Sequence, residues 1–295
     1  DTLLEAIDVC DVDGFCYGNY TDEEAGTGCT VIVAPEAPPA ALTFAAVLQH
    51  RAKPTCCDPE HRRQGPRRLP FGWIGLWLEA ASGVARELES RGIGLPVGPT
   101  QVPIVCSSCI FDLAFGNPTV RPDIEAGIAA VREALDHTPT KLEQGNVGAG
   151  TGATVGKLMG PATCMKAGLE LPPWHSAIKV GAVVSVNACG NVVDPFTGEW
   201  VAGMRAAADS DQIVDMELAA FAAAGSMQMP LDRTNTTISC IVTNVELTKA
   251  QATKVSQMAE THAHAIRPTH TTNDGDTIYT LASGKLAPRQ APPFP

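Results

Sequence analysis

Near its C-terminal end the chain reads Arg233-Thr-Asn-Thr-Thr-Ile238, and residues of alternating character follow from Thr237 to Val245. This alternation predicts a β-strand. If the bond between Asn235 and Thr236 were cleaved, Thr236 would gain a free α-amine beside its hydroxyl, with a pKa of roughly 7.7–8.0. A threonine activated by its own terminal amine is a recognised pair of nucleophile and base. The alternative interpretation is ordinary turn chemistry, because Asn is common where a strand begins.

The residues around this strand add further motifs. A capping box at Thr248–Gln251 predicts the start of a helix with apolar Ala252, Val255, Ala259 and Ala263. Beyond it lies Ile266-Arg-Pro-Thr-His-Thr-Thr-Asn-Asp-Gly-Asp-Thr277. Earlier stretches are Thr21-Asp-Glu-Glu-Ala-Gly-Thr-Gly-Cys-Thr30 and Gly145-Asn-Val-Gly-Ala-Gly-Thr-Gly-Ala-Thr-Val-Gly-Lys157. Together with Asn235–Val245, these stretches resemble the self-processing DmpA-type aminopeptidases, and within them the threonine branch typified by nylon-oligomer hydrolases.

The resemblance implies an α/β fold, the αββα sandwich of the N-terminal-nucleophile hydrolases, formed by one hydrolase domain over residues 1–295. It implies self-cleavage into an α chain (1–235) and a β chain (236–295). The implied substrates are short peptides or amides with a free amino end, with 6-aminohexanoate (nylon) oligomers among them. Family members need no metal or organic cofactor and assemble as homo-oligomers, commonly tetramers.

The resemblance also assigns site residues. Thr236 is the expected nucleophile, and Asn187 matches the position whose side-chain amide faces the developing oxyanion. Lys157 matches a lysine whose charge would depress the pKa of the nucleophile and keep the threonine amine neutral. Asp274 and Asp276 match groups that orient the nucleophile and recognise a substrate amine.

Taken without the resemblance, these residues have simpler interpretations. Asn187 would end a strand in a turn, and Lys157 would be a surface lysine. The spacing of Asp274 and Asp276 suggests calcium, but the other ligands of a calcium loop are missing. His270 is close enough in sequence to suggest a base; we expect a structural role. Phe111 stands where the family commonly has a tyrosine, whose hydroxyl this chain therefore lacks.

The glycine-rich run before Lys157 does not have the spacing of a nucleotide-binding loop, and Leu158 stands where a phosphate loop needs Ser or Thr. We expect its glycines to allow close approach of the backbone. Cys106 and Cys109 have the spacing of a redox or metal pair, but no second pair accompanies them. The cysteines are expected to be reduced, as in intracellular proteins.

Composition agrees with an enzyme of this kind. The 295 residues are 44% hydrophobic and carry a net charge of −11, which argues against binding to nucleic acid. No apolar run reaches the ~18 residues of a membrane span. The first residues lack a basic region, so no signal peptide is visible and a cytoplasmic location is expected. The absence of an initiator Met leaves a removed leader open.

Hydrophobic periodicity and breaker residues predict alternating helices and strands. The predicted strands are Cys29–Ala34, Pro103–Cys106, Ile178–Asn187, Thr237–Val245 and Thr277–Ala282. The predicted helices are Leu78–Arg91, Pro122–His137 and Asp211–Ala224, with a further helix after Thr248. The segment Gly225–Asn235 is predicted to be an exposed loop, where cleavage is sterically possible.

Two segments depart from the family. Residues 51–77 are locally basic and Pro-rich where the family has small residues, and a Pro-rich tail, Ala287–Pro295, replaces an expected closing helix. A shifted reading frame or a basic arm for an acidic partner would each account for the first segment. Two other functions therefore remain open: an acyltransferase of related fold that moves an acetyl group with the same threonine chemistry, and a chain that never matures and is catalytically dead.

Overall fold

The computed structural model describes residues 6–36, 47–48, 74–113, 115–170, 173–175, 178–223, 235–259, 265–269, 271 and 275–287. Most of the unusual segment 51–77, the loop up to residue 234, and the tail from residue 288 lie outside these residues. So do His270 and Asp274. No helix within the described part of the chain is long and apolar enough to cross a membrane.

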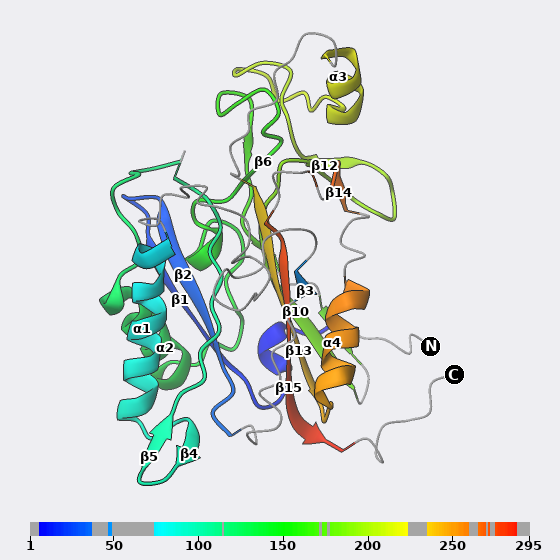
Figure 1. Cartoon of the computed structure of the whole chain (residues 1–295). Helices are drawn as coiled ribbons and strands as arrows, with labels where there is room; N and C mark the ends of the chain where they lie inside the picture. The colour runs from blue at the N-terminus through cyan, green and yellow to red at the C-terminus, as the bar shows by residue number, and fades with distance from the viewer. Residues whose placement is uncertain are drawn as a thin grey trace, which may run out of the picture.

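The described elements form four layers (Figure 1). Helices α1 (Ile74–Ser90) and α2 (Ile124–Asp136) cover one face of a hairpin of β1 (Cys16–Asp22) and β2 (Thr27–Val33). The other face of the hairpin looks toward the main sheet, and α4 (Lys249–Met258) packs on the far side of that sheet against β15 and β3. This arrangement is the αββα order that the resemblance implies.

The main sheet has the order β3-β15-β13-β10-β8, with β9 also paired to β10. Its two longest strands, β13 (Thr236–Val245) and β15 (Thr277–Leu286), run parallel, and β10 (Lys179–Asn187) runs antiparallel to β13. The remaining strands of the sheet are short: β3 (Val47–Leu48), β8 (Leu169–Glu170) and β9 (Pro173–His175). The strand that begins at Thr236 therefore lies between two partners.

Smaller elements extend from this sandwich. At one end lie α3 (Met216–Ala223) and three paired strands, β11 (Asn191–Val193), β12 (Trp200–Ala202) and β14 (Ile266–Arg267) (Figure 1). Two further ribbons pair β6 (Thr154–Val155) with β7 (Met165–Lys166), and β4 (Leu95–Val97) with β5 (Thr100–Val102). The described elements also include two 3-10 turns, Val9–Asp11 and Gly148–Gly150.

Most of the predicted elements are present with shifted ends. The predicted strand Pro103–Cys106 is wrong, because these residues belong to no strand and follow β5, which pairs only with β4. The predicted helix Asp211–Ala224 begins later, at Met216, because Asp215 caps its first turn by accepting hydrogen bonds from Glu217 and Leu218. Thr248 and Gln251 form the predicted capping box at α4.

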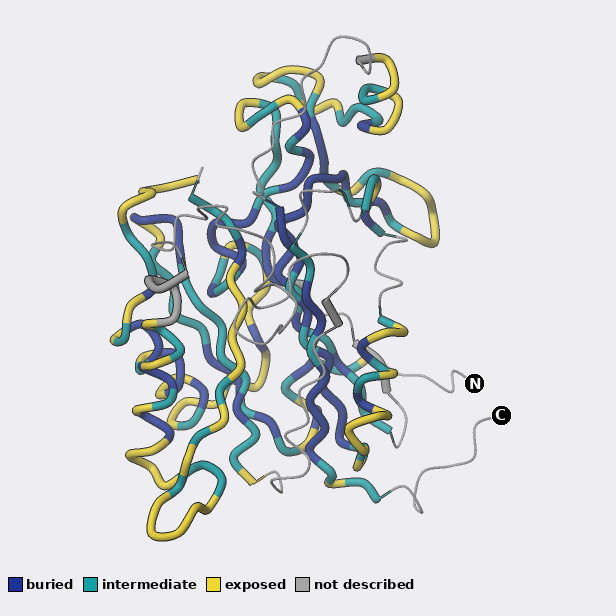
Figure 2. Tube along the Cα trace, in the orientation of Figure 1, coloured by how far each residue is buried: buried dark blue, intermediate teal, exposed yellow. Residues whose placement is uncertain are grey.

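Two apolar clusters hold the layers together, and the main-sheet strands are the most continuously buried part of the trace (Figure 2). One cluster lies between the hairpin and the main sheet and includes Tyr17, Leu169 and Val242. The other lies between the hairpin and the two helices and includes Val33, Val84, Leu88, Val131 and Ala134. Burial of such side chains contributes about 1.5–3 kcal/mol each.

Helices α1 and α2 cross at two glycines. A Cβ on Gly83 would lie 2.0 Å from the carbonyl oxygen of Ile124, and one on Gly127 would lie 2.0 Å from that of Ala80. Close contact brings the charged residues of both helices together: Glu87, which is 8% exposed, accepts hydrogen bonds from Arg91 and Arg132. The Arg132 guanidinium is the largest cause that lowers the pKa of this carboxyl below its usual value, and Arg91 adds to it.

We expect Glu87→Gln to lower the melting temperature by roughly 2–4 °C at neutral pH. A carboxyl whose folded-state pKa is depressed stabilises the fold above its unfolded pKa of ~4.3, and this contribution is lost as pH falls through the folded-state value. The difference from wild type should therefore shrink below about pH 4. Thermal unfolding at several pH values tests this, with the exposed Glu89→Gln on the same helix as control. A deficit that is unchanged at low pH would contradict it.

Candidate active site

Thr236 is the first residue of β13 and lies opposite Asn187, the last residue of β10. Both are buried: Thr236 is 8% exposed and Asn187 is fully buried. Antiparallel partners in a ladder lie about 4.5–5.5 Å apart at Cα. Two of the predicted site residues, 49 positions apart in the sequence, thus become direct neighbours through strand pairing.

Lys157 joins this pair. Its Nζ donates hydrogen bonds to the backbone oxygen of Asn187 at 3.0 Å and to Oδ1 of the same residue at 2.6 Å. The backbone N–H of Thr154 donates to that Oδ1 as well, and Asn187 Nδ2 donates to the Phe111 carbonyl oxygen at 2.9 Å. The interpretation of Lys157 as a surface lysine is therefore wrong. Lys157 is half-buried, and its ammonium is hydrogen-bonded to Asn187, the strand partner of Thr236.

The glycine-rich run brings Lys157 to this position. A Cβ on Gly156 would lie 2.1 Å from the Met204 nitrogen, and one on Gly152 would lie 2.3 Å from Asp112 Oδ2. Gly156 also has a φ of +71°, which favours glycine. The run thus packs its backbone directly against neighbouring groups, as the sequence predicted, and the next residue reaches β10.

On the other side of β13, the turn before β15 contacts the same strand head. Asp276 Oδ1 accepts a hydrogen bond from the Thr237 N–H at 2.6 Å, and the Gly275 N–H donates to the Asn235 carbonyl oxygen at 3.0 Å. Asp276 is thereby brought to the residue that follows Thr236. Asp274 lies outside the described residues, so its predicted position beside Asp276 remains a prediction.

The bond between Asn235 and Thr236 is not exposed, although the sequence predicted that it would end an exposed loop, Gly225–Asn235; residues 225–234 of that segment lie outside the described residues. Asn235 is only 5% exposed, because its carbonyl is bonded to the Gly275 turn and the next residue enters the sheet. Within the described residues, Asn235 Oδ1 and Thr237 Oγ1 are buried without a hydrogen-bond partner. Such a bond is inaccessible to an external protease, whereas the adjacent Thr236 hydroxyl needs no access from solvent.

Two titratable residues near the site, Asp112 and Lys166, belong to none of the motifs that the sequence predicted to form the site. Burial raises the pKa of the Asp112 carboxyl, and the nearby Lys166 and Lys157 oppose this shift. Burial lowers the pKa of Lys166 to about 8, opposed by Asp112. The Lys166 ammonium lies 3.7 Å from the centre of the Phe115 ring. Asp112 directly follows Phe111, and Lys166 reaches the site because β7 pairs with β6, where it lies opposite Thr154.

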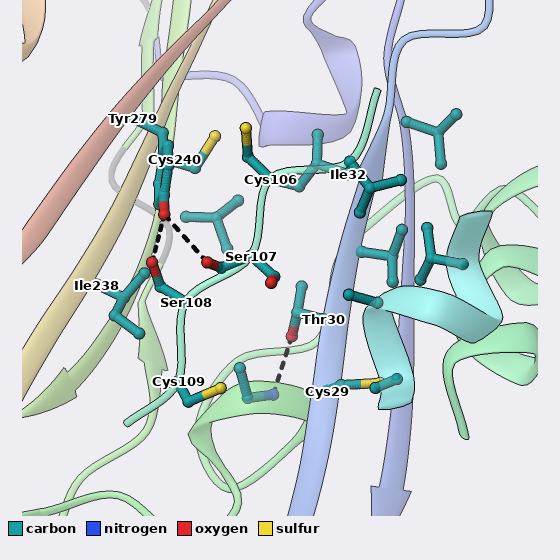
Figure 3. Close-up of a pocket in the computed structure, with 18 of the residues that line it drawn as sticks. Cys29, Thr30, Ile32, Cys106, Ser107, Ser108, Cys109, Ile238, Cys240 and Tyr279 are labelled. Carbon is teal, nitrogen blue, oxygen red and sulfur yellow. Dashed lines mark hydrogen bonds between the residues drawn. The ribbon is translucent and has the colours of Figure 1, made fainter. Parts of the chain in front are cut away.

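A cavity of about 310 Å³ lies between the hairpin and the main sheet. Ile238 and Ser185 line this cavity and pair with each other. Each lies two residues along its strand from Thr236 or Asn187, and therefore on the same face of the sheet. Figure 3 shows Cys106, Ser107, Ser108 and Cys109 on a segment that passes between the two layers, with the Tyr279 hydroxyl bonded to Ser108. The walls of the cavity are mainly apolar side chains of β2, α1 and β13.

The side chains around the site do not form a metal centre within the described residues. Among the residues that the structure describes, no group of three or more His, Cys, Asp or Glu is arranged to hold a metal ion. Cys106 and Cys109 are free cysteines, and desolvation by neighbouring atoms raises the pKa of each thiol, to about 11 for Cys109. The groups that converge near Thr236 are an amide, an ammonium, a carboxylate and backbone N–H donors, which suit acyl transfer.

Sequence relatives are peptidases and amidases. An uncharacterised aminopeptidase of Mycobacterium leprae is 33% identical over 293 residues, which cover 94% of this chain and 79% of the relative. The 6-aminohexanoate-oligomer endohydrolase of Paenarthrobacter ureafaciens is 30% identical over 221 residues, covering 73% of this chain and 59% of that enzyme.

Solved structures show the same fold at low identity. The L-aminopeptidase D-Ala-esterase/amidase of Ochrobactrum anthropi, described as a variant of the Ntn-hydrolase fold, superposes with a TM-score of 0.50 at 14% identity, over 97% of this chain and 77% of that chain. A β-aminopeptidase of Burkholderia sp. gives 0.52 at 16% identity, over 95% and 73%. A profile of peptidase family S58 matches residues 72–293, and the chain belongs to that family.

Proposed function

We propose that the chain cleaves itself between Asn235 and Thr236 and that Thr236 then acts as an N-terminal nucleophile. Membership of family S58 makes the protein an amide-bond hydrolase. The mature chains would be 1–235 and 236–295. The proposed substrates are short peptides or amides with a free amino end, among them 6-aminohexanoate oligomers, as the name of the Paenarthrobacter relative suggests.

The observation that carries the proposal is the position of Thr236 at the head of β13, beside the hydrogen-bonded pair of Lys157 and Asn187. Lys157 supplies a positive charge and Asn187 an oriented amide, on the residue that pairs with Thr236 across the two strands. A positive charge favours the deprotonated form of a nearby nucleophile and the neutral form of a nearby amine. Both effects serve a threonine that uses its own α-amine as base.

Self-cleavage is proposed as an N-to-O acyl shift. The Thr236 hydroxyl oxygen adds to the Asn235 carbonyl carbon, and the bond between that carbon and the Thr236 nitrogen breaks. The nitrogen takes up the proton that the hydroxyl gives up, so an ester and a free amine result. Water then hydrolyses the ester, which releases the Asn235 carboxylate and restores the Thr236 hydroxyl.

Turnover repeats this chemistry on a substrate. The Thr236 amine takes the hydroxyl proton while the oxygen attacks the substrate amide, and it returns the proton to the leaving nitrogen. Water clears the acyl-enzyme. In the proposal, the Asn187 amide stabilises the substrate oxyanion, and Asp274 and Asp276 orient Thr236 and bind the substrate ammonium.

Assembly and location are parts of the same proposal. We expect a homo-oligomer, commonly a tetramer in this family, acting on small amides. A cytoplasmic location is supported by the free cysteines among the described residues, since reducing compartments keep thiols unpaired.

Intact mass under denaturing conditions tests the proposed cleavage. Wild type should give two fragments that meet at Asn235 and Thr236, and Thr236→Ala should stay uncut because it lacks the hydroxyl. Thr236→Ser should still be cut, since it keeps one. A wild-type chain that stays whole would refute self-processing, and a cut Thr236→Ala chain would exclude its hydroxyl as the nucleophile.

Lys157→Met should reduce turnover per processed chain by about 100-fold. Asn187 would lose the ammonium that donates to its backbone and side-chain oxygen atoms, and its amide would no longer be held in the orientation proposed for binding an oxyanion. The measurement is the steady-state hydrolysis of an amino-acid anilide, corrected for the processed fraction. Lys141→Met, at an exposed lysine, serves as the control. Equal turnover in the two variants, with equal melting temperatures, would remove Lys157 from the mechanism.

A further inference from the structure

We infer that the backbone N–H of Gly275 is the oxyanion donor for self-cleavage, and that it is distinct from the Asn187 amide proposed for substrate turnover. The inference rests on the proposed self-processing. It assigns to the cleavage step a backbone N–H, which a sequence motif cannot indicate. In the uncut chain this N–H already donates to the Asn235 carbonyl oxygen at 3.0 Å. That oxygen is the atom on which negative charge would develop when Thr236 attacks.

The topology of the main sheet separates the two donors. β13 lies between β10, which carries Asn187, and β15, which follows Gly275. The Asn235 carbonyl bonds to the β15 side of its strand, away from β10. The Asn187 amide nitrogen donates instead to the Phe111 carbonyl. The carbonyl of the bond to be cut and the Asn187 amide are thus directed to different partners.

The Gly275 donor is also held in place before the reaction. The next residue, Asp276, accepts a hydrogen bond from the Thr237 N–H at 2.6 Å, and Thr277 then pairs with Ile238 in the sheet. Two consecutive residues of this turn therefore bond to the residues on either side of Thr236. A donor that is already positioned needs no reorganisation when charge develops, and the burial of the accepting Asn235 strengthens the interaction.

During the acyl shift the Asn235 oxygen gains negative charge as the Thr236 oxygen adds, and the hydrogen bond from Gly275 strengthens. When the carbon–nitrogen bond breaks, the carbonyl reforms as an ester and the proton of the hydroxyl ends on the new amine. Gly275 neither gains nor loses a proton. Its contribution is electrostatic only.

The backbone N–H, and not the missing side chain, is the required feature. A Cβ at position 275 would lie 3.6 Å from Thr236 Oγ1 and 3.8 Å from the Asn235 oxygen, which are ordinary contacts. The φ of Gly275 is outside the left-handed region. Alanine should therefore fit, so Gly275→Ala keeps the donor and serves as the matched reference for its removal.

The experiment replaces residue 275 of the full-length chain by lactic acid through nonsense suppression in cell-free translation, which changes one N–H into an ester oxygen and leaves the alanine methyl. The processed fraction is followed with time beside wild type and Gly275→Ala. We expect the lactate chain to be processed about 100-fold more slowly than Gly275→Ala, the typical effect of losing one oxyanion donor. Lactate in place of Ala282, within β15, controls for an ester elsewhere in the same strand.

The outcomes distinguish failure of the Gly275 donor from failure of the proposed self-processing. If wild type is processed and the two residue-275 chains differ by less than about twofold, the Gly275 donor is refuted while self-processing stands. If both lactate chains slow equally, the effect is general to β15 and the inference is again overturned. If wild type is not processed at all, self-processing fails and the inference fails with it.

Discussion

The pairing of β13 with a different strand on each side is the constraint on which the rest of the site depends. On one side the ladder sets Asn187 opposite Thr236, and on the other the turn into β15 bonds to the residues that flank Thr236. The start of β13 therefore cannot shift without the loss of ladder hydrogen bonds to β10 and of the hydrogen bonds to Gly275 and Asp276. The groups proposed to react are therefore positioned by the paired ends of β10 and β13 and by the turn that leads into β15.

The layers around this strand explain how distant segments reach it. The glycine-rich run can pack its backbone against its neighbours only because it lacks side chains, and this approach carries Lys157 to Asn187. Strand β2 of the hairpin and helix α1 close the opposite side of the cavity that begins beside Ile238. The site thus uses an intersheet space, with charges at one end and apolar walls along its length.

Much of this arrangement could be predicted from the sequence, because local patterns mark it. The alternation after Thr236, the capping box at Thr248 and the glycines before Lys157 each have a direct physical interpretation, and each agrees with the structure. The strand predicted at Pro103–Cys106 failed because its apolar composition says nothing about a pairing partner. Lys157 looked like a surface residue because its contact with Asn187 depends on tertiary packing.

Other features had no sequence signal at all. The burial of Asn235 follows from a hydrogen bond between backbone groups, and the Gly275 N–H is a donor that every residue except proline carries. The opposed pKa shifts of Asp112 and Lys166 arise from burial next to each other. Such groups become recognisable only when the fold brings them together.

The central claim is that Thr236 becomes the nucleophile of an amide hydrolase. Rapid acid quenching during turnover of an amino-acid ester, followed by peptide mass spectrometry, would locate the acyl group of the intermediate. The account predicts an acyl ester on the hydroxyl of Thr236, at the start of the fragment 236–295. Accumulation of the acyl group on another residue, with Thr236 unmodified, would contradict it.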